Sequence, residues 1–254
     1  GFYTILLSEC KCEAYAYGHQ CCDFSDGTLV CLTPGESISM KENNKEFPSK
    51  GWILAFHPDL ICGTPLGLNI HNYTFFSYCP EEALHLSLRE KQIILEFLER
   101  IRQELERCID RHSKKIISKY IELLLDYCTR FYERQFITRS EVNKKVFREF
   151  NHLLDNHFNV KVSLSTDVLS DEYCANLLHL SPAYFNDLLK YEIGKEFKEY
   201  IQFKRFEIAK GWLVNTDKTL GQIAQELGFS NSQYFSRLFK KITGCSPNEF
   251  RMPN

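Results

Sequence analysis

The sequence predicts an α+β protein whose N-terminal part is β-rich and then helical, and whose C-terminal part is entirely helical. Short apolar segments rich in β-branched and aromatic residues occupy residues 1–79. From about Glu81 the apolar residues recur at helical spacing instead. Two similar segments, at 181–194 and 231–244, indicate a duplicated helical unit near the C-terminus. We therefore expect a domain at 1–140, with a β-rich part (1–79) and a helical part (80–135), and a second domain at 141–254.

Composition limits the classes of function that the chain can have. A chain of 254 residues that is 44% hydrophobic can bury a core in each of two domains. The net charge of -2 excludes a globally basic surface, so any nucleic-acid interface must be local. No apolar run approaches the roughly 20 residues of a membrane span. Because Gly1 begins within a strand-like segment without an initiator Met, we expect residues of the natural protein to precede it.

The 11 cysteines are odd in number and irregularly spaced, and no repeated C-x-x-C pair occurs. Neither a disulfide framework nor a zinc ribbon is indicated, and the expected compartment is a reducing cytoplasm. A metal or redox sensor would need the one local cluster of thiols and imidazole: Cys10, Cys12, His19, Cys21 and Cys22. The favoured interpretation is that these thiols are buried or have no chemical role, so no cofactor or metal is expected.

Four segments carry the strand signal of the N-terminal part: 3–7, 28–32, 52–56 and 73–78. Asp26-Gly27 and Pro34-Gly35 are turn signals between them. Short strands joined by such turns predict an antiparallel barrel or sandwich, and the mouth of a barrel is a common small-ligand site.

The candidate ligand contacts of this part are Trp52, Phe56 and His57. His57 begins a short polar segment among apolar residues, and Trp52 and Phe56 lie close to it in the sequence. The alternative is that His57 and Pro58 form a turn that ends the strand, and this reading is favoured. The sequence contains no convergent acid–base pair, no nucleophile with its base and no metal set, so no enzyme is expected.

The middle of the chain predicts an antiparallel pair of helices. Glu90 to Ile109 places its apolar residues on one stripe, whereas Lys114 to Tyr132 is apolar on more than one face. A helix that must bury two faces packs on its own domain and on a partner, so we expect a homodimer through the helices at 90–132. An intramolecular bundle without a dimer is the alternative. The polar stretch at 130–141 is the expected linker.

Two consecutive amphipathic helices predict a DNA-reading helix-turn-helix near the C-terminus. The first helix begins at Leu220 and stops at Gly228, where the chain can turn at positive φ. The second runs from Asn231 to Gly244, with an apolar face and a polar, basic face. A helix, a tight turn and a helix with a basic outer face are typical of DNA-binding modules.

The same unit occurs earlier in the chain. Tyr184, Phe185, Leu188, Lys190 and Gly194 match Tyr234, Phe235, Leu238, Lys240 and Gly244, and we interpret the aromatic and leucine positions as core. The segment between the copies, 196–214, predicts a helix about 28 Å long. Successive major-groove segments on one face of DNA lie about 34 Å apart, so this helix could hold both readers over adjacent grooves.

These motifs resemble the AraC/XylS family of bacterial transcription regulators. The resemblance is carried by 223–230, 234–241 and 243–247, with 180–185 in the first copy. The N-terminal part, including 51–60 and 134–139, is similar to a subset that we associate with Bacteroidetes-type bacteria. The resemblance implies a cupin-like effector and dimerisation domain before the DNA-binding module. It also implies that a small molecule tunes binding to double-stranded DNA or contact with RNA polymerase.

The resemblance also implies which residues face DNA. In the first copy they are Ala183, Asn186, Asp187 and Lys190; in the second they are Ser232, Gln233, Ser236, Arg237, Lys240 and Lys241. Asn, Gln and Arg pair with base edges, whereas Ser and Lys more often hold phosphates. Asp187 stands where the second copy has Arg237, which leaves the base contacts of the first helix open.

The predicted function is therefore sequence-specific transcription regulation with a small-molecule effector. The alternative is a ligand-independent regulator whose N-terminal domain only dimerises or docks a protein partner. Residues 147–254 hold thirteen Lys/Arg and thirteen Asp/Glu, so this half is neutral overall, and Arg237, Lys240 and Lys241 are concentrated on the second reader. We expect moderate affinity from one module, a steep loss with salt, and a need for dimerisation.

Overall fold

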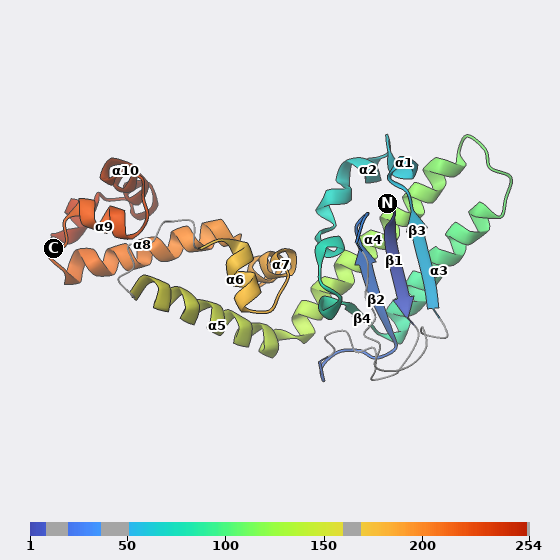
Figure 1. Ribbon diagram of the computed structural model, residues 1–254, viewed down its shortest axis with the longest axis horizontal. Coiled ribbons are helices and arrows are strands. Elements are labelled where there is room, and N and C mark those ends of the chain that lie inside the picture. Colours follow the sequence, from blue (N-terminus) through green and yellow to red (C-terminus); the bar gives the residue numbers. More distant parts are fainter. Residues whose placement is uncertain (9–19, 37–50, 160–168, 253–254) are drawn as a thin grey trace.

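The computed structural model describes residues 1–8, 20–36, 51–159 and 169–252. Figure 1 shows an elongated molecule with the β-sheet at one end and the last helices of the chain at the other. The N-terminal sheet and its helices, the first duplicated unit and the second duplicated unit follow one another along the long axis.

The sheet has four antiparallel strands in the order β3-β1-β2-β4. The strands are β1 (Tyr3–Ser8), β2 (Gly27–Leu32), β3 (Gly51–Phe56) and β4 (Leu84–Leu86). Ile5 and Leu7 of β1 are buried while their neighbours are less so, as expected where successive side chains point to opposite faces. Three of the predicted strands are confirmed. Over the described residues the sheet is open, so the predicted cupin-like barrel is not confirmed.

The fourth predicted strand, at 73–78, is wrong. This segment contains the 3-10 helix η3 (Thr74–Ser77). Phe75 and Phe76 are consecutive in sequence and both buried, which a strand with alternating faces cannot achieve against one core. The other short elements between β3 and β4 are α1 (Pro58–Ile61), α2 (Pro65–Asn69), η2 (Ile70–Asn72) and η4 (Pro80–Glu82).

Two long helices cover one face of the sheet (Figure 1), and both were predicted. They are α3 (Leu88–Leu105) and α4 (Ser113–Thr138). A capping box between Ser87 and Glu90 starts α3. The buried Gln135 of α4 donates to the Ala83 carbonyl at 3.0 Å and accepts from the His85 N–H at 2.8 Å. Gln135 thereby satisfies backbone groups along β4, at the edge of the described sheet.

The expected linker at 130–141 is a helix junction rather than an extended segment. α4 continues to Thr138 and α5 (Ser140–Asn159) begins two residues later. Arg139 at the junction is buried, and its guanidinium donates to both carboxylate oxygens of Asp23, at 2.9 and 2.6 Å. An ion pair therefore joins the junction to the segment that precedes β2.

The duplicated helical unit is confirmed. The first copy is α6 (Asp171–Leu177) and α7 (Pro182–Ile193), and the second is α9 (Leu220–Glu226) and α10 (Ser232–Thr243). The connecting helix α8 (Phe197–Asn215) contributes to the cores of both copies, and α11 (Pro247–Arg251) closes the second. Thr219 caps α9, and Pro247 begins α11, as the sequence predicts.

The tight turn inside each copy uses the same backbone geometry with different residues. Gly228 has φ 73° in the second copy, and His179 has φ 56° at the equivalent position of the first. The left-handed region costs a residue with a Cβ roughly 1 kcal/mol, which glycine avoids. The first turn therefore carries a strain that the second does not.

Candidate nucleic-acid interface

The outer face of α10 is exposed and cationic. Gln233, Arg237, Lys240 and Lys241 are exposed, and Ser232 and Ser236 are half-buried. Asn231 caps the helix by accepting the Tyr234 N–H at 2.7 Å, which fixes the direction in which the helix starts. We call Ser232, Gln233, Ser236, Arg237, Lys240 and Lys241 the α10 outer face. All six of its members were predicted from the sequence, and they lie on one helix.

The α10 outer face has the chemistry needed to hold DNA. The Arg237 guanidinium lies 5.7 Å from the centre of the Tyr234 ring, and its planar fork can donate two parallel hydrogen bonds to a guanine edge. Lys240 and Lys241 stand in the last turn, where their ammonium groups can reach phosphates.

The buried side of α10 differs from the prediction in one position. Phe235 and Phe239 are fully buried in the core of the second copy, together with Phe206 of α8. Tyr234, which was interpreted as core, is 39% exposed, so that interpretation is wrong. Helical periodicity assigns a residue to a face, but Tyr234 lies at the edge of that face, where its ring packs beneath Arg237 instead.

The predicted groove residues of α7 have different surroundings from one another. Lys190 is exposed, and Ala183 is partly buried against the N-terminal core. The Asn186 amide donates to Asp171 at 3.1 Å and to the Pro182 carbonyl at 3.0 Å, so both hydrogen bonds stay within the first copy.

Asp187 contacts the N-terminal part of the chain. Its carboxylate accepts from the Tyr78 hydroxyl at 2.7 Å and from the Thr74 hydroxyl at 2.5 Å. Burial, and then the negative charge of Asp187, raise the pKa of Tyr78 above its usual value, so the phenol stays a donor. Sequence reasoning missed this contact. The only signal was that an acid stands where the second copy has Arg237.

The start of α7 also contacts the N-terminal part. Glu82 of η4 is buried, and its carboxylate accepts from the Ser181 N–H at 2.6 Å and from the Ser181 hydroxyl. Burial raises the pKa of Glu82, while these hydrogen bonds act in the opposite direction. A carboxylate at the N-terminal end of a helix is favoured by the helix dipole.

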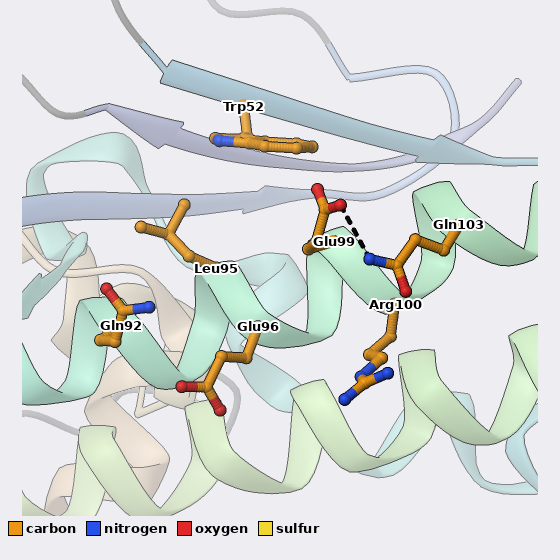
Figure 2. A pocket seen from close by; sticks show the side chains of 7 residues that line it. All are labelled: Trp52, Gln92, Leu95, Glu96, Glu99, Arg100 and Gln103. Atoms are coloured by element: carbon orange, nitrogen blue, oxygen red, sulfur yellow. Dashed lines mark hydrogen bonds between the residues drawn. The ribbon is translucent and has the colours of Figure 1, made fainter.

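The predicted effector residues do not form one cluster. Phe56 is buried and stacks on Tyr3 at 5.3 Å. His57 caps α1 by accepting the Asp59 N–H at 3.3 Å, which matches the strand-ending turn. Trp52 lines a hollow of about 450 Å³ between β3 and α3 (Figure 2). The other lining residues, all on α3, are Gln92, Leu95, Glu96, Glu99, Arg100 and Gln103.

The described residues lack two further kinds of feature, a metal-binding cluster and a membrane-spanning helix. No group of three or more His, Cys, Asp or Glu side chains there could hold a metal ion. Cys10, Cys12 and His19 lie outside the described residues, while Cys21 and Cys22 are exposed free thiols. Within the same part of the chain, no helix is both long and apolar enough to cross a membrane.

Residues 174–252 match the model of a helix-turn-helix domain family. The chain is 33% identical over 111 residues to the uncharacterized HTH-type transcriptional regulator YtdP of Bacillus subtilis. These residues are 44% of this chain and 14% of that protein. The arabinose operon regulatory protein of Salmonella typhimurium is 32% identical over 101 residues, or 40% of this chain and 32% of that protein.

A third relative matches beyond the helix-turn-helix units. The uncharacterized HTH-type transcriptional regulator YijO of Escherichia coli is 24% identical over 225 residues, which are 89% of this chain and 76% of that protein. The chain spans well under half the length of the other two relatives.

Proposed function

Because the chain belongs to the AraC/XylS family of transcription regulators, we propose that it regulates transcription by binding specific sequences of double-stranded DNA. The observation that carries this proposal is the exposed, cationic α10 outer face on a helix-turn-helix. A basic reading helix on an otherwise neutral half is the local charge pattern that such a function needs.

We assign roles within the interface by side-chain chemistry. Arg237 and Gln233 contact base edges, whereas Ser232, Ser236, Lys240 and Lys241 hold phosphates. In the first copy Asn186 is the base-contacting candidate, Lys190 the phosphate-contacting one, and Ala183 an apolar contact. α8 has 19 residues and is therefore about 28 Å long, which suits two readers in successive major-groove segments about 34 Å apart.

We further propose that the functional division of the chain falls at 140/141, with a cupin-like effector and dimerisation domain before it. The dimer uses the helices at 90–132. Its support is a stripe along α4 at helical spacing, Ile116, Tyr120, Leu123 and Tyr127, none of which is buried. RNA polymerase is the further partner that the family implies for a protein of this kind.

The hollow beside Trp52 is the proposed effector site, because an aromatic side chain and a Leu lie in it beside charged and amide groups. A ligand-independent regulator remains the second candidate function. The contacts of two predicted effector residues favour this second candidate. Phe56 packs in the core and His57 caps a helix, so both have structural roles.

The interface is tested by Arg237→Ala. Loss of a bidentate base contact costs about 1–3 kcal/mol, so affinity for a duplex selected from a random-sequence pool by the unmodified chain should fall about ten-fold or more. Asp187→Ala should cause no comparable loss of affinity, because Asp187 has no positive charge to offer DNA. Fluorescence anisotropy titrations at fixed salt measure both.

Arg89→Ala is the matched control, since Arg89 is an exposed Arg of α3 outside the interface. Its affinity should equal that of the unmodified chain. Equal losses from Arg237→Ala and Asp187→Ala would show that the roles of the two reading helices are assigned wrongly.

A further inference from the structure

The two reading helices share a Tyr, a Phe, a Leu and a Lys at equivalent positions but have very different surroundings. Tyr184 of α7 is 4% exposed, whereas its equivalent Tyr234 of α10 is 39% exposed. The N-terminal part of the chain covers Tyr184: the centre of the Tyr184 ring lies 5.1 Å from that of Tyr78 and 5.2 Å from that of Phe136. Tyr184 and Leu188 accordingly belong to the N-terminal core cluster rather than to their own. The covering of α7 is therefore an added contact and not a property of the repeat.

Asp187 is the polar anchor of this contact. It is one of the positions expected to face the groove, yet it accepts two hydroxyl hydrogen bonds from the η3 region. Hydrogen bonds to a charged acceptor are about twice as strong as neutral ones. A phosphate backbone would offer the same carboxylate only like-charge repulsion. The chemistry of Asp187 thus fits the N-terminal partner and opposes DNA.

Glu82 occupies the N-terminal end of α7. Backbone N–H groups at the start of a helix and the helix dipole attract anions, and DNA phosphates are bound at such positions. In this chain the carboxylate of Glu82 accepts from the Ser181 N–H and hydroxyl, and it is buried there. A carboxylate of the N-terminal part therefore stands where a phosphate would be held.

The same contact blocks the approach of α7 to a duplex. The major groove is about 12 Å wide, and an α-helix with its side chains has a diameter of about 10–12 Å, so a reading helix must present a free outer side. On α7 that side contacts the end of η3, η4 and the end of α4, through Tyr78, Glu82 and Phe136 respectively. Figure 1 shows α7 beside the end of α4. We call Thr74, Tyr78, Glu82 and Phe136 the docking surface.

We propose that the docking surface and DNA compete for α7, so that the docked chain reads DNA through α10 alone and must release α7 to use both readers. This proposal rests on the DNA-binding function proposed above. It gives Asp187 the role of an intramolecular anchor rather than a base contact. Any agent that loosens the docking surface would raise DNA affinity, because the apparent dissociation constant scales inversely with the released fraction.

The test changes only the N-terminal part, so that the DNA-binding half is untouched. The double variant Thr74→Val, Tyr78→Phe removes both donors to Asp187 and keeps the shape of each side chain. Tyr73→Phe is the matched control, because the Tyr73 hydroxyl donates to Asp126 within the N-terminal part at 2.8 Å. The probe is a duplex selected from a random-sequence pool by the unmodified full chain.

The double variant should bind this duplex about ten-fold more tightly than the unmodified chain and the control, and backbone hydrogen exchange in α7 should be faster. In the unmodified chain, saturation with the duplex should speed exchange at Thr74 to Glu82. Equal affinities for all three chains, or unchanged protection of Thr74 to Glu82 in the DNA complex, would overturn the proposal. If no chain selected any duplex, the proposed function and this inference would both fail.

Discussion

At the scale of single residues, the buried ion pair between Asp23 and Arg139 joins the segment that precedes β2 to the junction between α4 and α5. Both side chains are buried, and the two hydrogen bonds between them run in parallel. Burial raises the pKa of Asp23, but the hydrogen bonds and positive charge of Arg139 outweigh it and hold the pKa below its usual value. Burial keeps the pKa of Tyr184 of α7 above its usual value, although the positive charge of Arg139 also acts on Tyr184 and lowers that pKa.

Asp23→Asn should destabilise the chain by about 3–5 kcal/mol at neutral pH, because it leaves the buried guanidinium uncompensated. The unfolded chain holds more protons on Asp23 than the folded chain below the usual pKa of 3.8. The stabilising effect of Asp23 is therefore fully present above that pH and is lost as pH falls through the lower, folded pKa. Urea unfolding midpoints at neutral pH and at a series of acidic pH values measure this.

Asp59→Asn is the control, since the Asp59 side chain is 89% exposed and should change stability by no more than about 0.5 kcal/mol. If the difference between Asp23→Asn and the unmodified chain stayed constant down to the lowest pH at which the chain folds, Arg139 would not be what stabilises the Asp23 carboxylate.

At the scale of elements, the sequence predicted the helix-turn-helix pair well and the N-terminal contacts poorly. The pair is local: the caps, the turn and the 3.6-residue period all lie within a few residues of one another. The burial of Tyr184 depends on Tyr78, more than a hundred residues away, and no periodicity encodes such a contact. The error at Thr74 to Ser77 has the same origin, because β-prone residues adopted the tight turn that buries Phe75 and Phe76 together.

Binding of a small-molecule effector in the hollow between β3 and α3 can be tested through Trp52. Trp52 is one of two Trp residues in the chain, so its fluorescence should report a ligand that enters the hollow. Two of the three charged lining residues, Glu96 and Glu99, are acidic and the third, Arg100, is basic. This acidic excess favours small molecules that carry a positive charge or donate hydrogen bonds. A panel of small aromatic amines should contain a compound that quenches the fluorescence. At saturation it should raise the melting temperature by about 5 °C.

Trp52→Phe should abolish the quenching, and Trp212→Phe in α8 should preserve it. Quenching that survives Trp52→Phe would place the ligand elsewhere. If the panel were extended to sugars, fatty acids and nucleotides and no compound shifted the melting temperature, the ligand-independent regulator would be the better assignment.

At the scale of the whole molecule, the two helix-turn-helix copies stand on one connecting helix. Phe197, Tyr200 and Ile201 of α8 pack in the first copy, and Phe206, Ala209 and Leu213 of the same helix pack in the second. The copies are therefore held at a set separation by one helix. We propose that, with α7 docked, α10 alone contacts DNA, so the affinity should be moderate and should fall with salt in proportion to the number of phosphates that α10 holds. A second chain would supply the missing contacts through effective concentration.

The dimer is tested at the centre of the exposed stripe on α4. Leu123 is 44% exposed there, and Leu123→Glu would place two like charges in a symmetric apolar interface. Sedimentation equilibrium should find the unmodified chain dimeric and Leu123→Glu monomeric, with DNA affinity reduced in parallel. Leu68→Glu on α2 is the matched control: Leu68 is 75% exposed and lies outside 90–132, so this variant should remain dimeric. A dimer that survives Leu123→Glu would exclude this surface, and a monomeric unmodified chain would make α3 and α4 an intramolecular hairpin.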